Sequence, residues 1–160
     1  MAKLVSSIII SYLLITSIEE TLSREVPFTK CPSPFGLLNS VDVTPCNGNP
    51  CVFKPGTNET VTVTFTPNEV VSKGDIHLYA KRGLIWIELP LKNPHICHEL
   101  HCPLKKGVPE TLSVTQQVPR ILAPGTNELK ADIVDQNGGM VVCGIIKVEI
   151  EGRNPYTDFE

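Results

Sequence analysis

The chain has 160 residues, of which 41% are hydrophobic and 6% aromatic, and it carries a formal net charge of −3. This length predicts a single domain with a core of its own. The small negative charge argues against nucleic acid as a partner and against strong electrostatic attraction to anionic membranes.

The beginning of the chain predicts a secretory signal peptide over residues 1–23. A short basic start, a mostly apolar run and then two glutamates form the usual layout of such a segment. The run is shorter than the roughly twenty residues that a membrane-spanning helix needs, which disfavours a membrane anchor. We expect cleavage between residues 17 and 23, one domain over 24–152, and a loose tail over 153–160.

Alternation with a period of two residues predicts β-strands along the rest of the chain. The clearest case is Thr60–Thr66, where threonines alternate with Val61, Val63 and Phe65. The pattern continues in six further segments, at 37–43, 75–80, 84–91, 112–118, 129–133 and 140–150. Turn residues separate the segments, and Asn137-Gly138 is a strong hairpin signal. About seven such strands predict an all-β, immunoglobulin-like antiparallel β-sandwich.

Six cysteines in a chain with a signal peptide predict disulfides. Cys46 and Cys51 flank a turn sequence, and Cys97 and Cys102 have the same four-residue gap, so each pair can close a local loop. Cys31 and Cys143 then remain. A bond between them would close a loop of 113 residues (143 − 31 + 1), and the loss of chain entropy in the unfolded state would make this bond worth about 4 to 5 kcal/mol.

The stretch HICHELHC, residues 95–102, has the composition of a metal site. Zinc requires thiolates, however, and an oxidised cysteine pair supplies none. The spacing also differs from the HExxH zinc helix. A site made from His95, His98 and His101 alone remains an alternative, but we expect no metal and no cofactor. If the three histidines lie beside a ligand pocket, their protonation in an acidic compartment could alter membrane docking or ligand release.

We find no catalytic motif, neither a G-x-S-x-G elbow nor a glycine-rich phosphate loop, and expect no enzyme. The inward-facing positions are mid-sized aliphatic residues. They fit either a closed, dry core or two sheets that part around an apolar cavity, and periodicity does not separate the two.

Several stretches together resemble a known family. They are VPFTKC at 26–31, VTPC at 43–46 with Cys51, TVTVTFTPN at 60–68, CHELHCPLKKG at 97–107, Val118-Pro119, and Cys143 in the last strand. This frame is similar to the lipid-recognition ML family, in its Niemann–Pick type C2 and group 2 mite allergen branch. The resemblance covers about 26–150 and implies an immunoglobulin-like sandwich with bonds Cys31–Cys143, Cys46–Cys51 and Cys97–Cys102. It also implies sheets that part around a hydrophobic ligand, typically a sterol.

The chain departs from that branch at the expected pocket. Leu89 stands at an aromatic position, Arg120 at an apolar one, and Ile133 at a tryptophan position, and Ala123–Gly125 replaces an expected tyrosine. Arg120 is either a contact for a lipid headgroup or a solvated loop charge. The lipid-binding residues that we predict are Val63, Phe65, Leu78, Ile85, Ile87, Leu89, Val114, Val118, Arg120, Ile133 and Ile146.

The resemblance implies a secreted, monomeric carrier that binds a sterol or similar lipid and transfers it between membranes or to a receptor. Its destination is extracellular fluid or the lumen of endosomes and lysosomes. The alternative is a recognition protein that presents a microbial or fatty-acyl lipid to a signalling partner. The sequon at Asn58 predicts a glycan.

Overall fold

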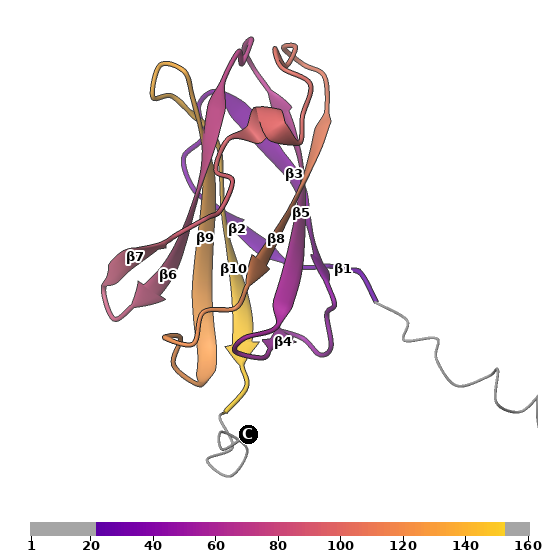
Figure 1. The fold of residues 1–160 in the computed structure, drawn as a ribbon. Helices are drawn as coiled ribbons and strands as arrows, with labels where there is room; N and C mark the ends of the chain where they lie inside the picture. Colours follow the sequence, from indigo (N-terminus) through magenta and orange to yellow (C-terminus); the bar gives the residue numbers. More distant parts are fainter. Residues whose placement is uncertain (1–21, 153–160) are drawn as a thin grey trace, which may run out of the picture.

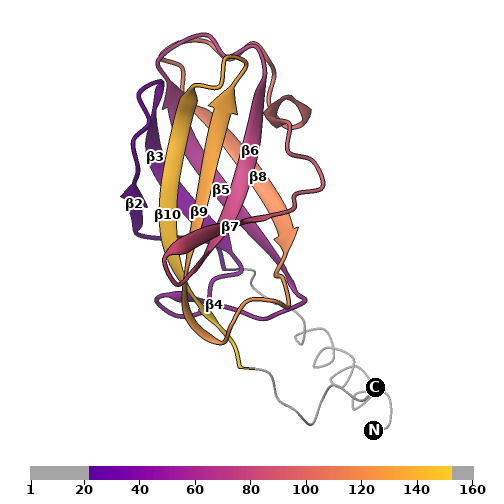
Figure 2. The same cartoon turned by 90° about the vertical axis from the view of Figure 1, so that its left-hand side faces the viewer.

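The structure is a computed structural model that describes residues 22–152. The predicted signal peptide up to residue 21 and the predicted tail over 153–160 therefore lie outside the described residues. Two sheets face each other in two layers (Figures 1 and 2). The first sheet has the order β1 (Arg24–Glu25), β3 (Gly36–Thr44), β5 (Asn58–Pro67), β8 (Glu110–Gln117).

The second sheet has the order β2 (Phe28–Lys30), β10 (Met140–Ile150), β9 (Gly125–Asp135), β6 (Gly74–Arg82), β7 (Ile85–Leu89). The short strand β4 (Cys51–Phe53) pairs in parallel with β10, and the other pairings are antiparallel. The fold class and all seven predicted strands are confirmed. The sequence did not reveal β1, β2 and β4, because strands of two or three residues are too short to show alternation.

The alternation in β5 separates an outer from an inner face. On the outer face, hydroxyl groups of β5 and β8 meet in three cross-strand pairs, Thr60–Thr115 at 2.8 Å, Thr62–Ser113 at 2.8 Å and Thr64–Thr111 at 3.3 Å. On the inner face, Val61 lies opposite Val114 and Val63 opposite Leu112. Threonine outside and valine inside is what a half-buried strand pair requires.

The chain between β7 and β8 crosses from one sheet to the other and carries the only helical turn of residues 22–152, the 3-10 helix η1 (Ile96–His98) (Figure 1). No helix in the described part of the chain is long and apolar enough to span a membrane. Ile96 points inward and is fully buried. Gly74 makes room for it, since a Cβ atom there would lie 2.8 Å from Ile96 Cδ1.

Three disulfides connect these elements. They join Cys31 to Cys143, Cys46 to Cys51, and Cys97 to Cys102, the pairing that the resemblance implies. None of the six cysteines is free. The first bond links the segment after β2 to the central strand β10.

Candidate functional site: an apolar cavity between the sheets

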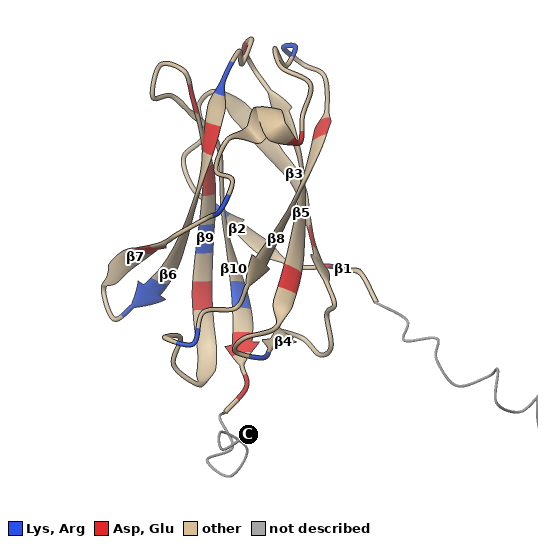
Figure 3. Cartoon of the chain, viewed as in Figure 1, with Lys and Arg blue, Asp and Glu red and all other residues tan. Residues whose placement is uncertain are grey.

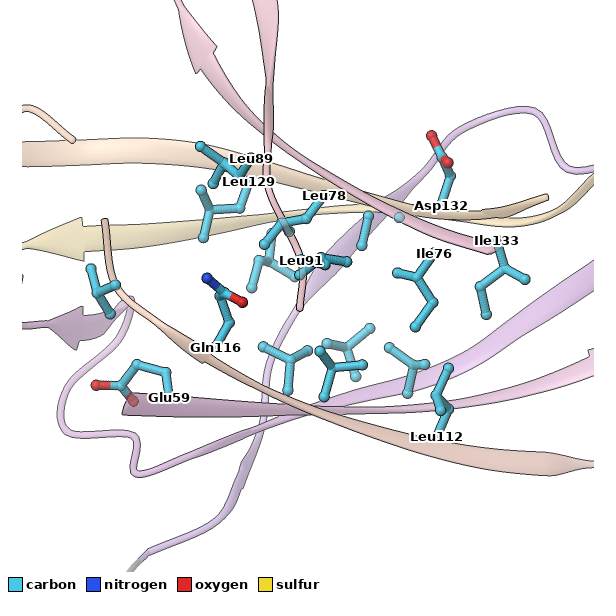
Figure 4. A pocket seen from close by; sticks show the side chains of 18 of the residues that line it. Glu59, Ile76, Leu78, Leu89, Leu91, Leu112, Gln116, Leu129, Asp132 and Ile133 are labelled. Atoms are coloured by element: carbon cyan, nitrogen blue, oxygen red, sulfur yellow. The ribbon is translucent and has the colours of Figure 1, made fainter. Parts of the chain in front are cut away.

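A cavity of about 120 Å³ lies between the two sheets. One wall comes from β3, β5 and β8, and the other from β6, β7, β9 and β10 (Figure 4). Its volume is close to that of an engineered apolar cavity of about 150 Å³ that stays dry and admits benzene. A larger ligand would require the lining to move apart. Twenty-four residues line it: Leu38, Val41, Phe53, Glu59, Val61, Val63, Ile76, Leu78, Leu89, Leu91, Leu112, Val114, Gln116, Gln117, Val118, Pro119, Leu122, Leu129, Ala131, Asp132, Ile133, Val142, Gly144 and Ile146.

The strand register explains the apolar wall on the second sheet. Ile76 lies opposite Ile133 and Leu78 opposite Ala131, so that these four side chains share the inner face of β6 and β9. Both strands continue with the same alternation. A shift of one residue in the strand register would turn all of these side chains toward the outer face, because successive side chains point to opposite sides of a strand.

Seven of the eleven residues predicted to bind lipid line the cavity. They are Val63, Leu78, Leu89, Val114, Val118, Ile133 and Ile146. They come from both sheets and from the chain just after β8. This placement brings them together around one space, while their role in binding stays a prediction.

The other four predicted residues do not line the cavity. Phe65 is fully buried, but its pair with Glu110 ends the β5–β8 ladder, beyond the cavity. Ile85 and Ile87 share the alternation of Leu89, yet the β6–β7 hairpin extends away from β8 (Figure 1). Ile85 is therefore 62% exposed.

Arg120 is the fourth. Its guanidinium lies over Gly56, where an added Cβ atom would be 3.5 Å from Arg120 Nη2. The side chain is thus held against the loop between β4 and β5 and contributes nothing to the cavity lining. Arg120 itself lies in the connection between β8 and β9. Side chains do not alternate between two faces in such a connection, so the sequence could not decide where this side chain points.

Four polar residues of the lining were not predicted from the sequence: Glu59, Gln116, Gln117 and Asp132. Glu59 and Gln116 are direct cross-strand neighbours, and they continue the inner face of Val61 and Val114 by one pair. The signal was present, because Glu59 has the same phase as Val61, Val63 and Phe65. Figure 4 shows both side chains at one end of the cavity.

Glu59 is only 6% exposed as a residue, and its carboxyl group has few hydrogen-bond partners for such a buried position. Its Oε1 lies 3.2 Å from the hydroxyl of Thr57, which has one hydrogen and lies closer, at 2.8 Å, to the carbonyl oxygen of Lys54. Its Oε2 is buried and has no hydrogen-bond partner among residues 22–152. An unsatisfied buried polar group costs about 1 to 3 kcal/mol. Burial raises the pKa of the Glu59 carboxyl, and the contact with Thr57 offsets part of this rise.

Asp132 is the second buried carboxyl group of the lining, but it faces the other way. Figure 4 shows its carboxyl group pointing away from the cavity. On that outer side Lys130 Nζ lies 3.8 Å from Oδ2. Burial raises the pKa of Asp132, and the charges of Lys130 and His77 act against this rise.

The HICHELHC stretch forms a loop closed by Cys97–Cys102 and lies at the end of the sandwich opposite Glu59. His95 Nδ1 contacts the carboxylate of Asp75, and the rings of His95 and His98 stack with centroids 6.1 Å apart. None of the three histidines lines the cavity. No group of three His, Cys, Asp or Glu side chains within residues 22–152 is arranged to hold a metal ion. The effect of histidine protonation stays a prediction.

The Lys, Arg, Asp and Glu positions coloured in Figure 3 are spread along the ribbon and do not separate by sign. Acidic and basic stretches alternate along β9, whereas the lower part of β8 carries no charge. The two packed sheets and the mostly apolar lining between them define the class of protein: an immunoglobulin-like β-sandwich with a hydrophobic internal site.

Comparison with known proteins identifies the family. The ML domain profile matches residues 25–150, and the chain belongs to the ML domain family. A mite group 2 allergen, Gly d 2.02 of Glycyphagus domesticus, is 31% identical over 116 residues, which cover 72% of this chain and 92% of the allergen. The NPC intracellular cholesterol transporter 2 of Sus scrofa is 30% identical over 149 residues, which cover 88% of this chain and 95% of the transporter.

A solved structure shows the same fold. The crystal structure of a Niemann-Pick type C2 protein from Japanese carpenter ant has a TM-score of 0.71 at 21% identity, and the match covers 78% of this chain and 99% of that chain. This likeness supports the fold, and the matching ML domain profile confirms the family resemblance seen in the sequence.

Proposed function

We propose that the protein is a secreted, non-enzymatic carrier that binds one hydrophobic lipid between its sheets and transfers it between membranes or to a receptor. The observation that carries this proposal is the apolar cavity, whose walls are built by the inner faces of both sheets. Burial of apolar ligand surface, at roughly 25 cal/mol per Å² before the costs of association, supplies the affinity.

The relatives support lipid as the ligand class. One of them is named as an intracellular cholesterol transporter, and it matches 88% of this chain. The ligand proposed here is a sterol or a lipid of similar size. Its volume exceeds that of the cavity, so binding requires the sheets to move apart, and the half-buried side chains Val61, Val63 and Leu78 lie where they would have to move.

The alternative, a protein that presents a lipid to a signalling partner, depends on a charged rim around the ligand. The sequence offered Arg120 as a contact for a lipid headgroup or as a solvated loop charge, and its guanidinium lies over Gly56, outside the cavity lining. We therefore favour the carrier. A glycan on Asn58, which is exposed at the start of β5, a monomeric state, and delivery to endosomes or lysosomes are further parts of the proposal.

The test is extraction of lipid from protein secreted by eukaryotic cells, followed by mass spectrometry and by titration with a fluorescent sterol. Val61→Phe places a ring in the cavity, and Thr62→Phe places the same ring on the outer face of the same strand. We expect Val61→Phe to lose at least tenfold in affinity and Thr62→Phe to bind as the wild type does. Absence of extracted lipid together with no sterol binding would contradict the proposal.

A further inference from the structure

The polar side chains Glu59 and Gln116 lie at one end of the cavity, whereas Asp132 belongs to the lining but points its carboxyl group away from the cavity. Along the paired strands β5 and β8, the inward pairs are Val63 with Leu112, Val61 with Val114, and finally Glu59 with Gln116. Directly opposed residues in an antiparallel pair have Cβ atoms about 5 Å apart, so the carboxyl and amide groups can reach one ligand atom. Figure 4 shows the Gln116 amide beside the apolar lining.

The Glu59 carboxyl group has an unused binding capacity at this end. Its Oε2 is buried without a partner among the described residues, and its Oε1 shares the single hydrogen of Thr57 with the Lys54 carbonyl. No ion pair within residues 22–152 includes Glu59. A buried carboxyl group that lacks a partner at the end of an apolar cavity is a candidate for recognition of a polar ligand atom.

We propose that Glu59, together with Gln116, binds the polar end of the lipid and that this end is a hydroxyl group. The inference rests on the proposed lipid-carrier function and specifies the ligand class of that same cavity. The hydrocarbon part then lies along Val61, Val114 and Leu112 toward Ile76 and Ile133.

A hydroxyl group fits Glu59 in both protonation states. It donates to the ionised carboxylate, and it accepts from the protonated acid or from the Gln116 amide. This matters because burial raises the pKa of Glu59, which brings the protonated form closer to neutral pH.

Other head groups fit less well. A lipid carboxylate would put a second negative charge beside Glu59 at a site of low dielectric constant, where like charges repel strongly. A lipid ammonium would lose its hydration in an otherwise apolar cavity, a cost that a single carboxylate repays poorly. A ligand with no hydrogen to donate would leave Oε2 unpaired and remove its last access to water.

The experiment compares four probes with one chain length: 1-dodecanol, 1-methoxydodecane, dodecanoate and dodecylamine. Each displaces the neutral dye N-phenyl-1-naphthylamine from the full mature chain at pH 7. We expect 1-dodecanol to bind at least tenfold more tightly than any of the other three.

Two variants connect this preference to Glu59. Glu59→Leu should abolish the preference for the alcohol over the ether and leave ether binding unchanged or stronger. Glu59→Gln should keep part of that preference and bind dodecanoate more tightly than the wild type, because the repelling charge is gone. Glu110→Leu is the matched control, since Glu110 pairs with Phe65 at the other end of the same ladder and does not line the cavity.

The outcomes separate the two proposals. If neither the dye nor any probe binds, the carrier function itself fails. If the probes bind but the ether equals the alcohol, if dodecanoate or dodecylamine binds best, or if folded Glu59→Leu retains the alcohol preference, the hydroxyl assignment is overturned and the carrier function stands.

Discussion

The two ends of the sandwich differ in how tightly their side chains pack. At the disulfide-loop end, formed by Val71, Ile96, Leu104 and the Cys97–Cys102 loop, the three apolar side chains are at most 1% exposed. Val71 and Leu104 also exchange two backbone hydrogen bonds, of 2.8 and 3.2 Å. At the cavity end, formed by Glu59, Val61, Gln116 and Leu122, side chains surround an empty space and one carboxyl oxygen lacks a partner.

This difference fits the proposed carrier function, in which a stable sandwich has to open to admit a lipid. Close-packed interiors respond sharply to any change in volume, whereas side chains around a cavity have already lost part of their dispersion contacts. In the proposed carrier, the disulfide-loop end would hold the two sheets together while the cavity end yields to the ligand. Four changes to the protein test this difference between the two ends, from the largest expected effect to the smallest.

Ile96→Ala should produce the largest loss of stability, about 2 to 5 kcal/mol, because a fully buried side chain leaves a cavity in a close-packed region. Urea denaturation measures the free energy of unfolding. Ile121→Ala, at a position that is 68% exposed, is the control and should cost much less. Lipid affinity of the folded Ile96→Ala protein should remain within about twofold of the wild type, and a large loss would show that the two ends are not independent.

Removal of the Cys97–Cys102 bond, as Cys97→Ala with Cys102→Ala, should cost about 2 kcal/mol through the entropy of closing a short loop. The Cys46–Cys51 bond has the same sequence separation of 5 and provides the matched comparison. Chain entropy alone predicts equal losses for the two pairs. A clearly greater loss for Cys97 and Cys102 would show that their bond also maintains the packing of Ile96.

Leu78→Ala should cost about 1 to 2 kcal/mol, less than Ile96→Ala, because Leu78 is only half-buried and already borders empty space. The same change enlarges the cavity, and we expect it to shift binding toward bulkier lipids in a competition assay with ligands of graded size. A destabilisation as large as that of Ile96→Ala would contradict the difference between the two ends.

Glu59→Gln should have the smallest effect, visible mainly as a change in pH dependence. The pKa of Glu59 is raised in the folded protein, so its contribution to stability is fully present below the unfolded pKa and is lost as the pH rises through the folded pKa. Glutamine does not titrate. The stability of the variant relative to the wild type should therefore increase between pH 4 and pH 7, as measured by thermal unfolding at both values, and a constant difference would refute the raised pKa.

Much of the cavity could be predicted from alternation, and the misses have specific causes. Val63, Leu78 and Ile133 were found because they lie in long strands with a clear inner face. Ile85 shares the phase of Leu89, but phase reports which way a side chain points and not what lies opposite it. Glu59 also has the inward phase, and it was overlooked because a carboxyl group is rarely expected in an apolar wall.

The sequence by itself determined the seven longer strands, most of their inner faces and the family, because side-chain alternation and the cysteine frame are local patterns that a linear chain can display. It also limited the three cysteine pairs to one reasonable arrangement. Only the tertiary structure decided where the two sheets close and where they part. That depends on how side chains far apart in the sequence fill the space between the sheets, and this packing leaves a cavity beside Glu59 and buries Ile96 fully.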